Sequence, residues 1–344
     1  MNDSKTPTFY IRDLPIYSDI ILAPMDGYSD WPFRSLCREL GSAMSYTEFI
    51  KVEKILSRSK QPAKRMYFTE SERPITFQLY GDDPDMILEA ALKVQESNPD
   101  VIDLNMGCPA KSIADRGAGV GMMRTPIKIA RTFRKLVKHL RVPVTGKIRL
   151  GWGRDKNYKL IARILEEEGG SLITVHGRTK EQRYTGNADW DAIAEVKSLV
   201  KIPVIGSGDV CTVADIDRMK QHTKCDAVMI GRGAIPNPWI FSRLDREQVT
   251  PEMMKETIRK HLARCVEFYG DEDGQRLFRK NAVQYVMMKH LTRDERKEIL
   301  KARPSAEFLE LLEKIYESPM LNVTPALARG ASVASSVGAK QSPD

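Results

Sequence analysis

A cysteine in a Gly-Cys-Pro turn is the residue of this chain most clearly placed to do chemistry. Cys108 follows the apolar run Val101–Leu104, which predicts a short buried strand, and Gly107 and Pro109 on either side predict a turn. Turns lie at the surface, whereas a buried structural cysteine acts only as a small apolar side chain. A thiol that follows a strand in this way is open to nucleophilic, redox, ligand or acid roles.

Polar or conformationally special residues also end seven other apolar runs that predict strands. In chain order these groups are Pro24, Met25 and Asp26; Glu48; Gln78; Lys147; His176; Ser207, Gly208 and Asp209; and Gly231 and Arg232, while Asn105 precedes Cys108. If the strands are parallel, their carboxyl ends meet at one pocket. There a lysine can stabilise negative charge, a glutamine offers a donor and an acceptor to the edge of a heterocycle, and a methionine offers an apolar surface to a planar ring.

Two glycine pairs indicate that one ligand carries a phosphate. The sequences Gly-Ser-Gly at 206–208 and Gly-Arg-Gly at 231–233 follow the last two predicted strands. Many such pairs are only tight turns, but the loops after strands seven and eight of a parallel barrel commonly bind phosphate. Arg232 adds a fixed positive charge with a forked set of donors. The two loops therefore predict a phosphorylated cofactor or substrate.

Strand and helix patterns alternate over the first two thirds of the chain. The predicted strands are Asp19–Pro24, Met44–Phe49, Ile75–Leu79, Val101–Asn105, Val144–Ile148, Leu172–Val175, Pro203–Ile205 and Ala227–Ile230. The clearest predicted helices are Pro84–Ser97, Pro126–Leu140, Asn157–Glu168, Trp190–Leu199 and Val213–Gln221. This alternation predicts parallel pairing, and a closed α/β barrel of the (β/α)8 TIM type accounts for the strand count better than an open doubly wound sheet.

A small all-helical C-terminal domain is predicted to follow the barrel. The chain from Thr250 to Glu317 shows helical periodicity without strand signals, at Met253–Phe268, Gly274–Lys289, Arg293–Lys301 and Ala306–Tyr316. We therefore divide the chain into a catalytic barrel domain, 1–245, and a helical domain, 246–317. The tail, 318–344, is rich in Ala, Ser, Gly and Pro, so we expect it to have no fixed structure.

The predicted helical domain carries a strongly basic segment. Between Arg276 and Arg303, nine Arg or Lys residues against three Asp or Glu residues give a net charge of +6 (9 − 3). The candidates for binding a polyanion such as RNA are Arg276, Arg279, Lys280 and Lys289. A charge run of this kind is most often only a solvated helix face, and we interpret a second basic run, Lys128–Arg141, as ordinary barrel surface.

Net charge, cysteine spacing and the distribution of apolar residues limit the classes of protein to which this chain could belong. The 344 residues carry a net charge of +8 with a pI near 9.1, which favours a polyanionic partner. The five cysteines are scattered and form no Cys-x-x-Cys pair, which argues against a disulfide framework and against a zinc site. We find neither a signal peptide nor an apolar run long enough to span a membrane. We therefore expect a cytoplasmic, monomeric protein that binds no metal and no membrane.

Seven motifs together resemble the tRNA-dihydrouridine synthases. They are Ala23-Pro24-Met25-Asp26-Gly27, Gln78-Leu79-Tyr80-Gly81, Asp103-Leu104-Asn105-Met106-Gly107-Cys108-Pro109, Arg116-Gly117-Ala118-Gly119, Lys147-Ile148-Arg149, Val175-His176-Gly177-Arg178-Thr179 and Gly231-Arg232-Gly233. They occur in the family's order over residues 18–243, and Asn-x-Gly-Cys-Pro followed by Gly-Ala-Gly is the most specific part. One departure is Ser207, where the family often has asparagine before Gly-Asp.

The resemblance implies an FMN enzyme that reduces the C5–C6 double bond of uridines in tRNA to 5,6-dihydrouridine, with NADPH or NADH as reductant. It implies hydride transfer from flavin N5 to C6 of uracil and proton transfer from Cys108 to C5. Asn105 and Arg178 are expected at the uracil, and the target base has to leave its stack. The FMN contacts that the resemblance implies are Pro24, Met25, Asp26, Gln78, Lys147, His176, Ser207, Gly208, Asp209, Gly231 and Arg232.

Two other functions are considered. A flavin barrel that acts on a free pyrimidine, as dihydroorotate dehydrogenases do, also places a catalytic residue on a loop over FMN. It has no need of a basic helical domain, and the motif from Asn105 to Pro109 does not suit it. A non-catalytic RNA-binding protein built on a barrel is the second alternative, and the candidate residues at all eight strand ends argue against it.

Overall fold

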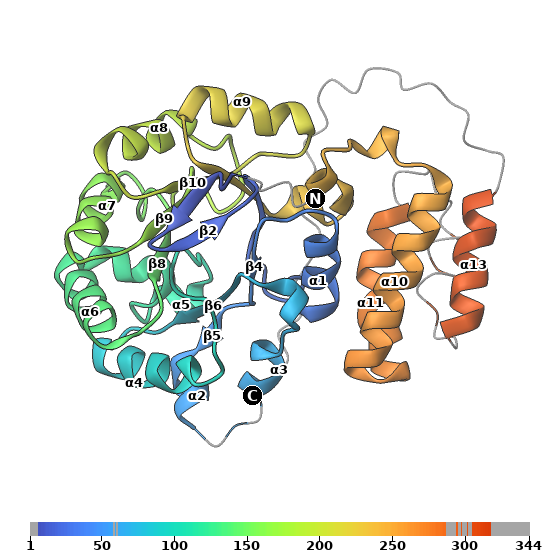
Figure 1. Cartoon of the computed structure of the whole chain (residues 1–344), viewed down its shortest axis with the longest axis horizontal. Coiled ribbons are helices and arrows are strands. Elements are labelled where there is room, and N and C mark those ends of the chain that lie inside the picture. The colour runs from blue at the N-terminus through green and yellow to red at the C-terminus, as the bar shows by residue number, and fades with distance from the viewer. Residues whose placement is uncertain are drawn as a thin grey trace.

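Eight parallel strands form a nearly closed barrel, as the sequence predicted (Figure 1). The strands are β3 (Ile20–Leu22), β4 (Ser45–Tyr46), β6 (Ile75–Tyr80), β7 (Val101–Met106), β8 (Val144–Ile148), β9 (Leu172–His176), β10 (Val204–Ser207) and β11 (Ala227–Ile230). Their order around the barrel is β3-β11-β10-β9-β8-β7-β6-β4. The structure is a computed structural model that describes residues 6–57, 59, 61–286, 294, 297, 301 and 305–317.

A serine hydroxyl closes the seam between β3 and β4. Ser42 Oγ accepts a hydrogen bond from the Leu22 N–H at 3.0 Å and donates to the Met44 carbonyl at 3.0 Å. Beside it, the Ala43 N–H donates to the Ile20 carbonyl at 2.8 Å. Because Ser42 is buried, this hydroxyl satisfies a strand-end N–H that no water could reach.

The second barrel strand, predicted as the single run Met44–Phe49, is divided in two. Both β4 and the short strand β5 (Ile50–Lys51) pair with β6. Three residues separate β4 from β5, whereas two residues of β6 lie opposite them, so the second strand carries one extra residue. An extra residue of this kind makes a bulge that can redirect a side chain. Here the Glu48 carboxylate accepts a hydrogen bond from the Gly27 N–H at the barrel mouth.

Helices cover the outside of the barrel, and those predicted from the sequence are confirmed. They are α4 (Pro84–Gln95), α6 (Pro126–His139), α7 (Tyr158–Glu167), α8 (Trp190–Leu199) and α9 (Val213–Thr223). The predicted caps are also present, since Asp189 accepts from the Ala192 N–H and Thr212 accepts from the Asp215 N–H. Several short helices were not predicted: α2 (Val52–Leu56), α3 (Gln61–Met66), α5 (Lys111–Ala114) and 3-10 turns at Glu70–Glu72, Gly119–Arg124, Arg232–Ala234, Pro238–Ser242 and Arg246–Gln248.

Helix α1 (Trp31–Glu39), which follows β3, was not predicted from the sequence either. It is nine residues long and starts with Trp, Pro and Phe, so its intrinsic helix signal is weak. Asp30 caps it by accepting from the Phe33 N–H at 3.3 Å. Packing against the barrel and against the helical domain therefore determines α1 more than propensity does.

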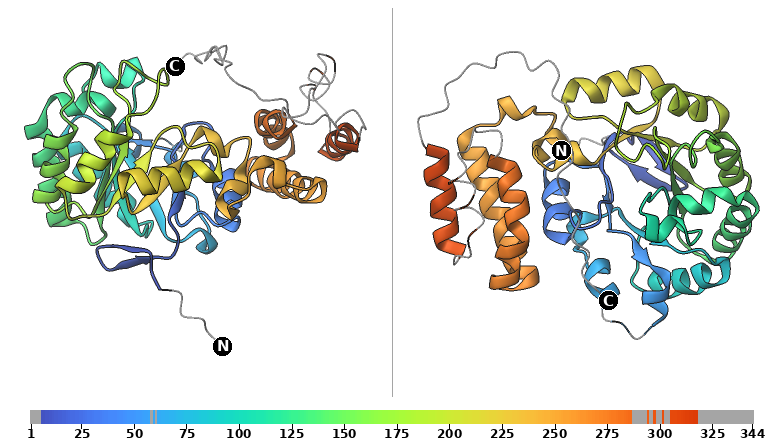
Figure 2. Two further views of the ribbon diagram at one scale, coloured as in Figure 1. Left: turned by 90° about the horizontal axis from the view of Figure 1, so that it is seen from above. Right: turned by 180° about the vertical axis from the view of Figure 1, so that it is seen from behind.

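A two-stranded hairpin seals the N-terminal end of the barrel (Figure 2). Strands β1 (Phe9–Ile11) and β2 (Leu14–Ile16) pair antiparallel, and this hairpin was not predicted from the sequence. Phe9, Ile11 and Ile16 are buried in one cluster with apolar side chains from inside the barrel. The apolar interior therefore lies at this end, and polar side chains gather towards the opposite, C-terminal end.

The helices α10 (Pro251–Tyr269), α11 (Asp271–Val286) and α13 (Ser305–Glu317) pack beside the barrel next to α1 (Figure 1). Their shared core includes Met254, Leu262, Phe278 and Phe308, together with Trp239 from the end of the barrel segment. Most of the predicted helix Arg293–Lys301 and the whole tail 318–344 lie outside the described residues. No helix in the described ranges is long and apolar enough to cross a membrane.

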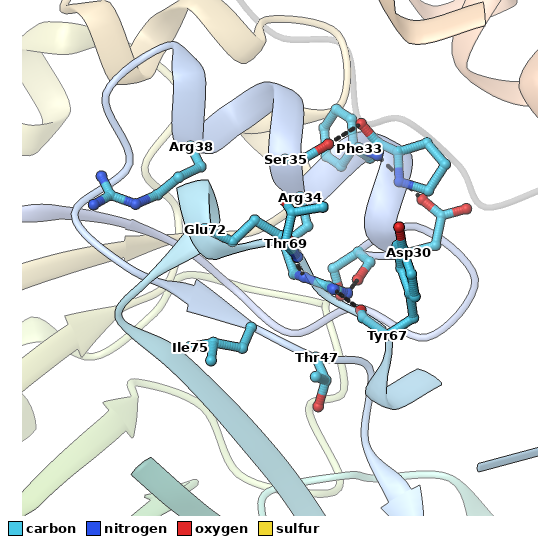
Figure 3. A network of polar contacts seen from close by, with 12 residues as sticks. Asp30, Phe33, Arg34, Ser35, Arg38, Thr47, Tyr67, Thr69, Glu72 and Ile75 are labelled. Atoms are coloured by element: carbon cyan, nitrogen blue, oxygen red, sulfur yellow. Dashed lines mark hydrogen bonds and ion pairs between the residues drawn. The ribbon is translucent and has the colours of Figure 1, made fainter. Parts of the chain in front are cut away.

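A fully buried ion pair fastens α1 to the segment that precedes β6 (Figure 3). Arg34 Nε donates to Glu72 Oε1 at 2.6 Å, and the two side chains are 1% and 0% exposed. Arg34 also donates to the Tyr67 carbonyl at 2.6 Å and the Ser29 carbonyl at 3.3 Å. The second Glu72 oxygen accepts from the Thr69 N–H at 3.0 Å. All three Arg34 side-chain nitrogens and both Glu72 carboxylate oxygens therefore have partners within the protein.

Candidate active site

The strand-end residues predicted from the sequence come together at the C-terminal mouth of the barrel. In the strand registers, Gln78 lies opposite Asp103, Asn105 opposite Lys147, and His176 opposite Ser207. Gln78 and Asn105 are buried, whereas Lys147 and His176 are half-buried at the upper edge of their strands. Side chains from β6 to β10 therefore line one continuous polar surface.

A line of hydrogen bonds joins Asp103 to the cysteine turn. Gln78 Nε2 donates to Asp103 Oδ2 at 2.7 Å, and Asn105 Nδ2 donates to Gln78 Oε1 at 2.8 Å. Asn105 Oδ1 then accepts from the N–H groups of Gly107 at 3.1 Å and Cys108 at 2.9 Å. The acceptor of Asn105, which was expected to contact uracil, is therefore used within the turn, and one N–H of its amide remains for a ligand.

The turn that carries Cys108 is held on several sides. The Cys108 carbonyl accepts a hydrogen bond from the Val120 N–H at 3.2 Å, and Arg149 Nε donates to the neighbouring Gly107 carbonyl at 2.9 Å. Gly119 has a φ of +54°, and a Cβ there would lie 2.9 Å from the Cys108 carbonyl oxygen and 3.1 Å from the Cys108 Cβ. This close approach explains the last glycine of the Arg-Gly-Ala-Gly motif.

The surroundings of the Cys108 thiol favour its neutral form. Burial raises its pKa above the ordinary cysteine value, and the nearby Asp26 acts in the same direction, while a hydrogen bond from the Ala110 backbone and then the Arg149 guanidinium oppose them. A buried thiol of raised pKa is a poor nucleophile but retains a proton that it can donate. The site therefore suits an acid role for Cys108 better than a nucleophilic one.

Positive charge is concentrated at the mouth. Burial, aided by the Arg149 charge, lowers the pKa of Lys147 to about 8, although Asp103 attracts its ammonium. Burial and then the neighbouring cations, Lys147 first, hold the pKa of His176 well below its usual range, so the imidazole is neutral. Burial lowers the pKa of Arg149 to about 10. This excess of buried cations favours an anionic ligand.

Asp209 orients Arg178 across the mouth. The Arg178 side chain is 2% exposed, and its Nη2 lies 2.6 and 2.7 Å from the two oxygens of Asp209. Nη2 also donates to the Gly186 carbonyl at 2.6 Å, and Nη1 lies 3.5 Å from His176 Nε2. Asp209, expected to contact the cofactor, therefore serves Arg178 and the Ala188 N–H in this structure.

The two predicted glycine loops lie beside these groups. Gly208 has a φ of +124°, and a Cβ there would lie 2.7 Å from the Ala188 Cβ. Its carbonyl accepts from the Trp190 indole at 3.0 Å, which fixes the loop. The Arg232 guanidinium is 55% exposed and lies 4.4 Å from the centre of the Tyr184 ring. Ser207 is buried, and Gly231 is half-buried against Met25 and Ala23.

The loop after β3 is fixed to the helical domain. Met25 accepts a hydrogen bond from Ser29 Oγ at its carbonyl and donates to the same hydroxyl, and the Asp26 carboxylate pairs with Arg65 at 2.8 Å. The Gly27 carbonyl accepts a hydrogen bond from the Lys280 ammonium of α11. Pro24 and Met25 are half-buried, so they present part of their surface to the mouth.

The residues predicted to bind RNA make mostly internal contacts where they are described. Lys280 is bound to Gly27 and lies 4.9 Å from the centre of the Tyr28 ring, so it links α11 to the loop after β3. Arg276 is exposed and pairs with Asp273 at 2.7 Å, and half-buried Arg279 approaches Gln275 at 3.5 Å. Lys289 lies outside the described residues.

The second basic run lies mostly on α6, on the outer surface of the barrel, as interpreted from the sequence. Arg131 and Lys135 both pair with Asp85, and Arg134 pairs with Glu168. These neighbouring acids reduce the net charge of the helix face.

The donor set at the mouth fits a flavin, the cofactor that the resemblance implies. Lys147 and His176 supply half-buried donors and Arg178 a buried one, and the described residues give the Lys147 ammonium no hydrogen-bonded acceptor. A planar ring with a negatively charged edge would satisfy that ammonium, and the glycine loops with Arg232 would receive a phosphate. Within the described residues, no group of three or more His, Cys, Asp and Glu side chains is arranged to hold a metal ion.

Sequence reasoning missed three residues of the site. Asp103 and Arg149 stand inside quoted motifs but received no role, because a buried charge at a strand end cannot be told from a solvated one by sequence. Tyr184 is 54% exposed and has the guanidinium groups of Arg149 and Arg232 at 5.6 and 4.4 Å from its ring centre. Its position five residues after the His-Gly-Arg-Thr motif was the only available signal.

The fold and the site define a (β/α)8-barrel enzyme with a protonated thiol and a cation-rich pocket at its C-terminal mouth. The chain belongs to the dihydrouridine synthase (Dus) family, whose model matches residues 21–318. The resemblance seen in the motifs is thereby confirmed over the barrel and the helical part of the chain.

Curated relatives with the same family name cover most of this chain. A "tRNA-dihydrouridine synthase B" of Pseudomonas aeruginosa is 37% identical over 276 residues, which cover 78% of this chain and 83% of the relative. A "probable tRNA-dihydrouridine synthase" of Aquifex aeolicus is 35% identical and covers 88% and 98%. A "tRNA-dihydrouridine synthase B" of Xanthomonas axonopodis pv. citri is 35% identical and covers 91% and 97%.

Similar solved structures share the barrel fold. Histamine dehydrogenase from Rhizobium sp. 4-9 superposes with a TM-score of 0.52 at 11% identity, over 74% of this chain and 50% of that structure. An amine oxidase acting on 6-hydroxypseudooxynicotine, from Pseudomonas geniculata N1, gives a TM-score of 0.50 at 12% identity, over 71% and 50%. The chain thus spans half the length of these structures, and the likeness concerns the fold.

Proposed function

We propose that this protein is an FMN-dependent tRNA-dihydrouridine synthase that takes its electrons from NADPH or NADH. The observation that carries the proposal is the Cys108 turn, which holds a neutral thiol beside buried cations at the barrel mouth. The names of the curated relatives supply the tRNA substrate. The family supplies the reaction class.

In this proposal each residue of the site has a separate role in the reaction. A bound reduced flavin would supply the hydride for C6 of the uracil ring. Cys108 then gives its proton to C5, and the Arg149 charge stabilises the thiolate that remains. Lys147 stabilises negative charge at a uracil oxygen, and the buried Arg178 guanidinium, whose Nη1 lies 3.5 Å from His176 Nε2, adds positive charge beside it. Neutral His176 can donate or accept a hydrogen bond without adding charge.

Other residues would hold the cofactor. Lys147 would contact the cofactor at the middle of the mouth, Gln78 would support that surface from a fully buried position, and Met25 offers an apolar flank to a planar ring. Ser207, Gly208, Gly231 and Arg232 lie together where a phosphate would bind. Asp209 and Asp26 act in this proposal through Arg178 and Arg65, which they hold.

The two alternative functions predict properties that differ from those of a tRNA-dihydrouridine synthase. An enzyme for a free pyrimidine would reduce or oxidise dihydroorotate or uracil without RNA, whereas a non-catalytic RNA-binding protein would bind tRNA and contain no flavin. The helical domain beside the mouth supports a macromolecular substrate, because α11 reaches the loop after β3 through Lys280. We also propose that the protein acts as a cytoplasmic monomer, with barrel and helical domains meeting near residue 245.

The first experiment is purification followed by flavin analysis and a reaction with tRNA. We expect a yellow protein that releases FMN on denaturation and that forms dihydrouridine in tRNA lacking the modification when NADPH is added. Mass spectrometry of digested tRNA measures the product and maps the uridine. Free uridine and dihydroorotate, tested in parallel, should not react. A colourless protein, or one that converts a free pyrimidine and leaves tRNA unchanged, would refute the proposal.

The helical domain should contribute phosphate contacts to tRNA binding. Because Arg276 is exposed on α11, we expect Arg276→Ala to weaken tRNA binding and to reduce the slope of log K against log salt by about 1. Filter binding at several salt concentrations measures both quantities. Lys138→Ala removes an exposed cation on α6, which lies on the opposite side of the molecule from α11 (Figure 1), and should change neither. Equal effects of the two substitutions would place the RNA platform elsewhere.

A further inference from the structure

Asp103 is a fully buried carboxylate that the proposed chemistry does not use. It lies inside the barrel on β7, two residues before Asn105, and its side chain is closed to solvent. One oxygen accepts from Thr145 Oγ1 at 2.6 Å, and the other accepts from Gln78 Nε2 at 2.7 Å. A buried charge is costly, so its presence in a barrel interior calls for a reason beyond filling space.

We propose that Asp103 is a positioning residue that fixes the Cys108 thiol through the amides of Gln78 and Asn105. These three side chains, with the N–H groups of Gly107 and Cys108, form the Asp103 relay. This inference rests on the proposed function, because it assigns Asp103 a task in placing the acid of that reaction.

Each hydrogen bond in the relay has a defined donor and acceptor. Burial raises the pKa of Asp103 to about 6, so near pH 7 the carboxylate is mostly ionised and only accepts hydrogen bonds. Gln78 must therefore turn its Nε2 towards Asp103 and its Oε1 towards Asn105. Asn105 must then donate to Gln78, which leaves its Oδ1 for the cysteine turn. From the other end, two backbone N–H groups demand an acceptor from Asn105, which requires the same orientation. The two ends agree, so the relay has one consistent arrangement.

Removal of the acceptor at position 103 would release this constraint. Gln78 could then turn its amide and present Nε2 to Asn105, which would place two donors face to face. Asn105 would have to turn in response, and Gly107 and Cys108 would lose the oxygen that holds them. The thiol would no longer be kept in one position, and small displacements of a reacting group can cost a large part of the rate.

A competing role for Asp103 is to serve as the counter-charge of Lys147. Asp103 does attract the Lys147 ammonium, but its hydrogen bonds go to Thr145 and Gln78. The two roles differ in what they require. A positioning role needs an acceptor facing Gln78, whereas a counter-charge role needs the negative charge.

The test compares Asp103→Asn with Asp103→Leu in the flavin-loaded protein. An asparagine can accept from Gln78 with its oxygen and donate to Thr145, whose hydroxyl rotates, so it keeps the relay without the charge. Leucine offers no acceptor. Each variant is checked for flavin content and thermal midpoint, then treated with iodoacetamide, and the alkylation of Cys108 relative to exposed Cys211 is measured by mass spectrometry.

We expect Asp103→Asn to keep the wild-type alkylation ratio and a single-turnover rate within about threefold. Asp103→Leu should raise the ratio severalfold and slow dihydrouridine formation by up to about 100-fold while flavin stays bound. Thr145→Val, which removes only the bond to the other carboxylate oxygen, is the matched control and should leave the ratio unchanged. If Asp103→Leu does not fold, Gln78→Leu breaks the next link and should raise the same ratio.

Two results would overturn the positioning role. An unchanged alkylation ratio in a folded Asp103→Leu or Gln78→Leu protein would show that the relay does not hold the turn. Equal damage by Asp103→Asn and Asp103→Leu would assign Asp103 to the charge of Lys147 instead. Failure of the proposed function is seen separately, as absence of dihydrouridine with the wild-type protein, and it leaves the alkylation comparison valid.

Discussion

Cys108→Ala should bind flavin and accept electrons from NADPH but form dihydrouridine about 100- to 10,000-fold more slowly than the wild type, the usual range for loss of a general acid. The thiol is the proton source for C5 in the proposed reaction, and burial keeps it protonated at neutral pH. Single-turnover reactions with reduced enzyme and tRNA measure the step directly. Flavin absorbance before and after NADPH addition shows whether the earlier step is intact.

Cys211→Ala provides the matched control for this experiment. Cys211 is an exposed free cysteine on the loop after β10 and has no part in the proposed chemistry. Its sulfur is partly buried although the residue as a whole is exposed, and this burial raises the pKa of the thiol, as it does for Cys108. We expect its substitution to leave the product yield unchanged. A normal single-turnover rate for Cys108→Ala would show that another group protonates C5, and the acid assignment would have to be withdrawn.

Arg34→Met should destabilise the protein by about 3–5 kcal/mol, the typical effect of removing one partner of a buried ion pair. Glu72 would remain without its main partner at a site where neither side chain reaches solvent. The same substitution frees the carbonyls of Ser29 and Tyr67, which Arg34 now satisfies. Urea unfolding followed by tryptophan fluorescence measures the free energy of unfolding.

The double substitution Arg34→Met and Glu72→Met separates the buried charge from the packing. An apolar pair of similar volume leaves no buried charge, so the double variant should be more stable than Arg34→Met alone. Ser29 also holds the Met25 backbone, so we expect flavin affinity to fall in the single variant. A loss below about 1 kcal/mol for Arg34→Met would show that the pair contributes no more than a surface ion pair.

Much of the fold was predictable because its signals are local. Most barrel strands lie in short runs of β-branched or apolar residues, and the confirmed outer helices have apolar residues at helical spacing. Two of the helix caps, Asp189 and Thr212, are recognisable in the sequence. The elements that were missed have weak local signals. The helix α1 is short and rich in aromatic residues, and the hairpin at Phe9–Ile16 gains its stability by closing the barrel.

The division of the second barrel strand could not be predicted from the sequence for a different reason. The run Met44–Phe49 is continuous in sequence, and nothing in it marks the extra residue between β4 and β5. That residue is defined only by the register against β6, a partner about thirty positions further along the chain. The direction of Glu48 towards Gly27 follows from this register.

By itself, the sequence determined the barrel, the family and the set of residues that meet at the mouth, because strand-end positions in a parallel barrel converge whatever the details of packing. It placed Cys108 at the centre of that set. Only the tertiary structure decided which of these residues face a ligand and which hold one another. Asp209 holds Arg178, Lys280 holds the loop after β3, and Asp103 orients the amides that carry the cysteine turn. Such pairings depend on distances between strands and domains, and side-chain types in a sequence do not encode those distances.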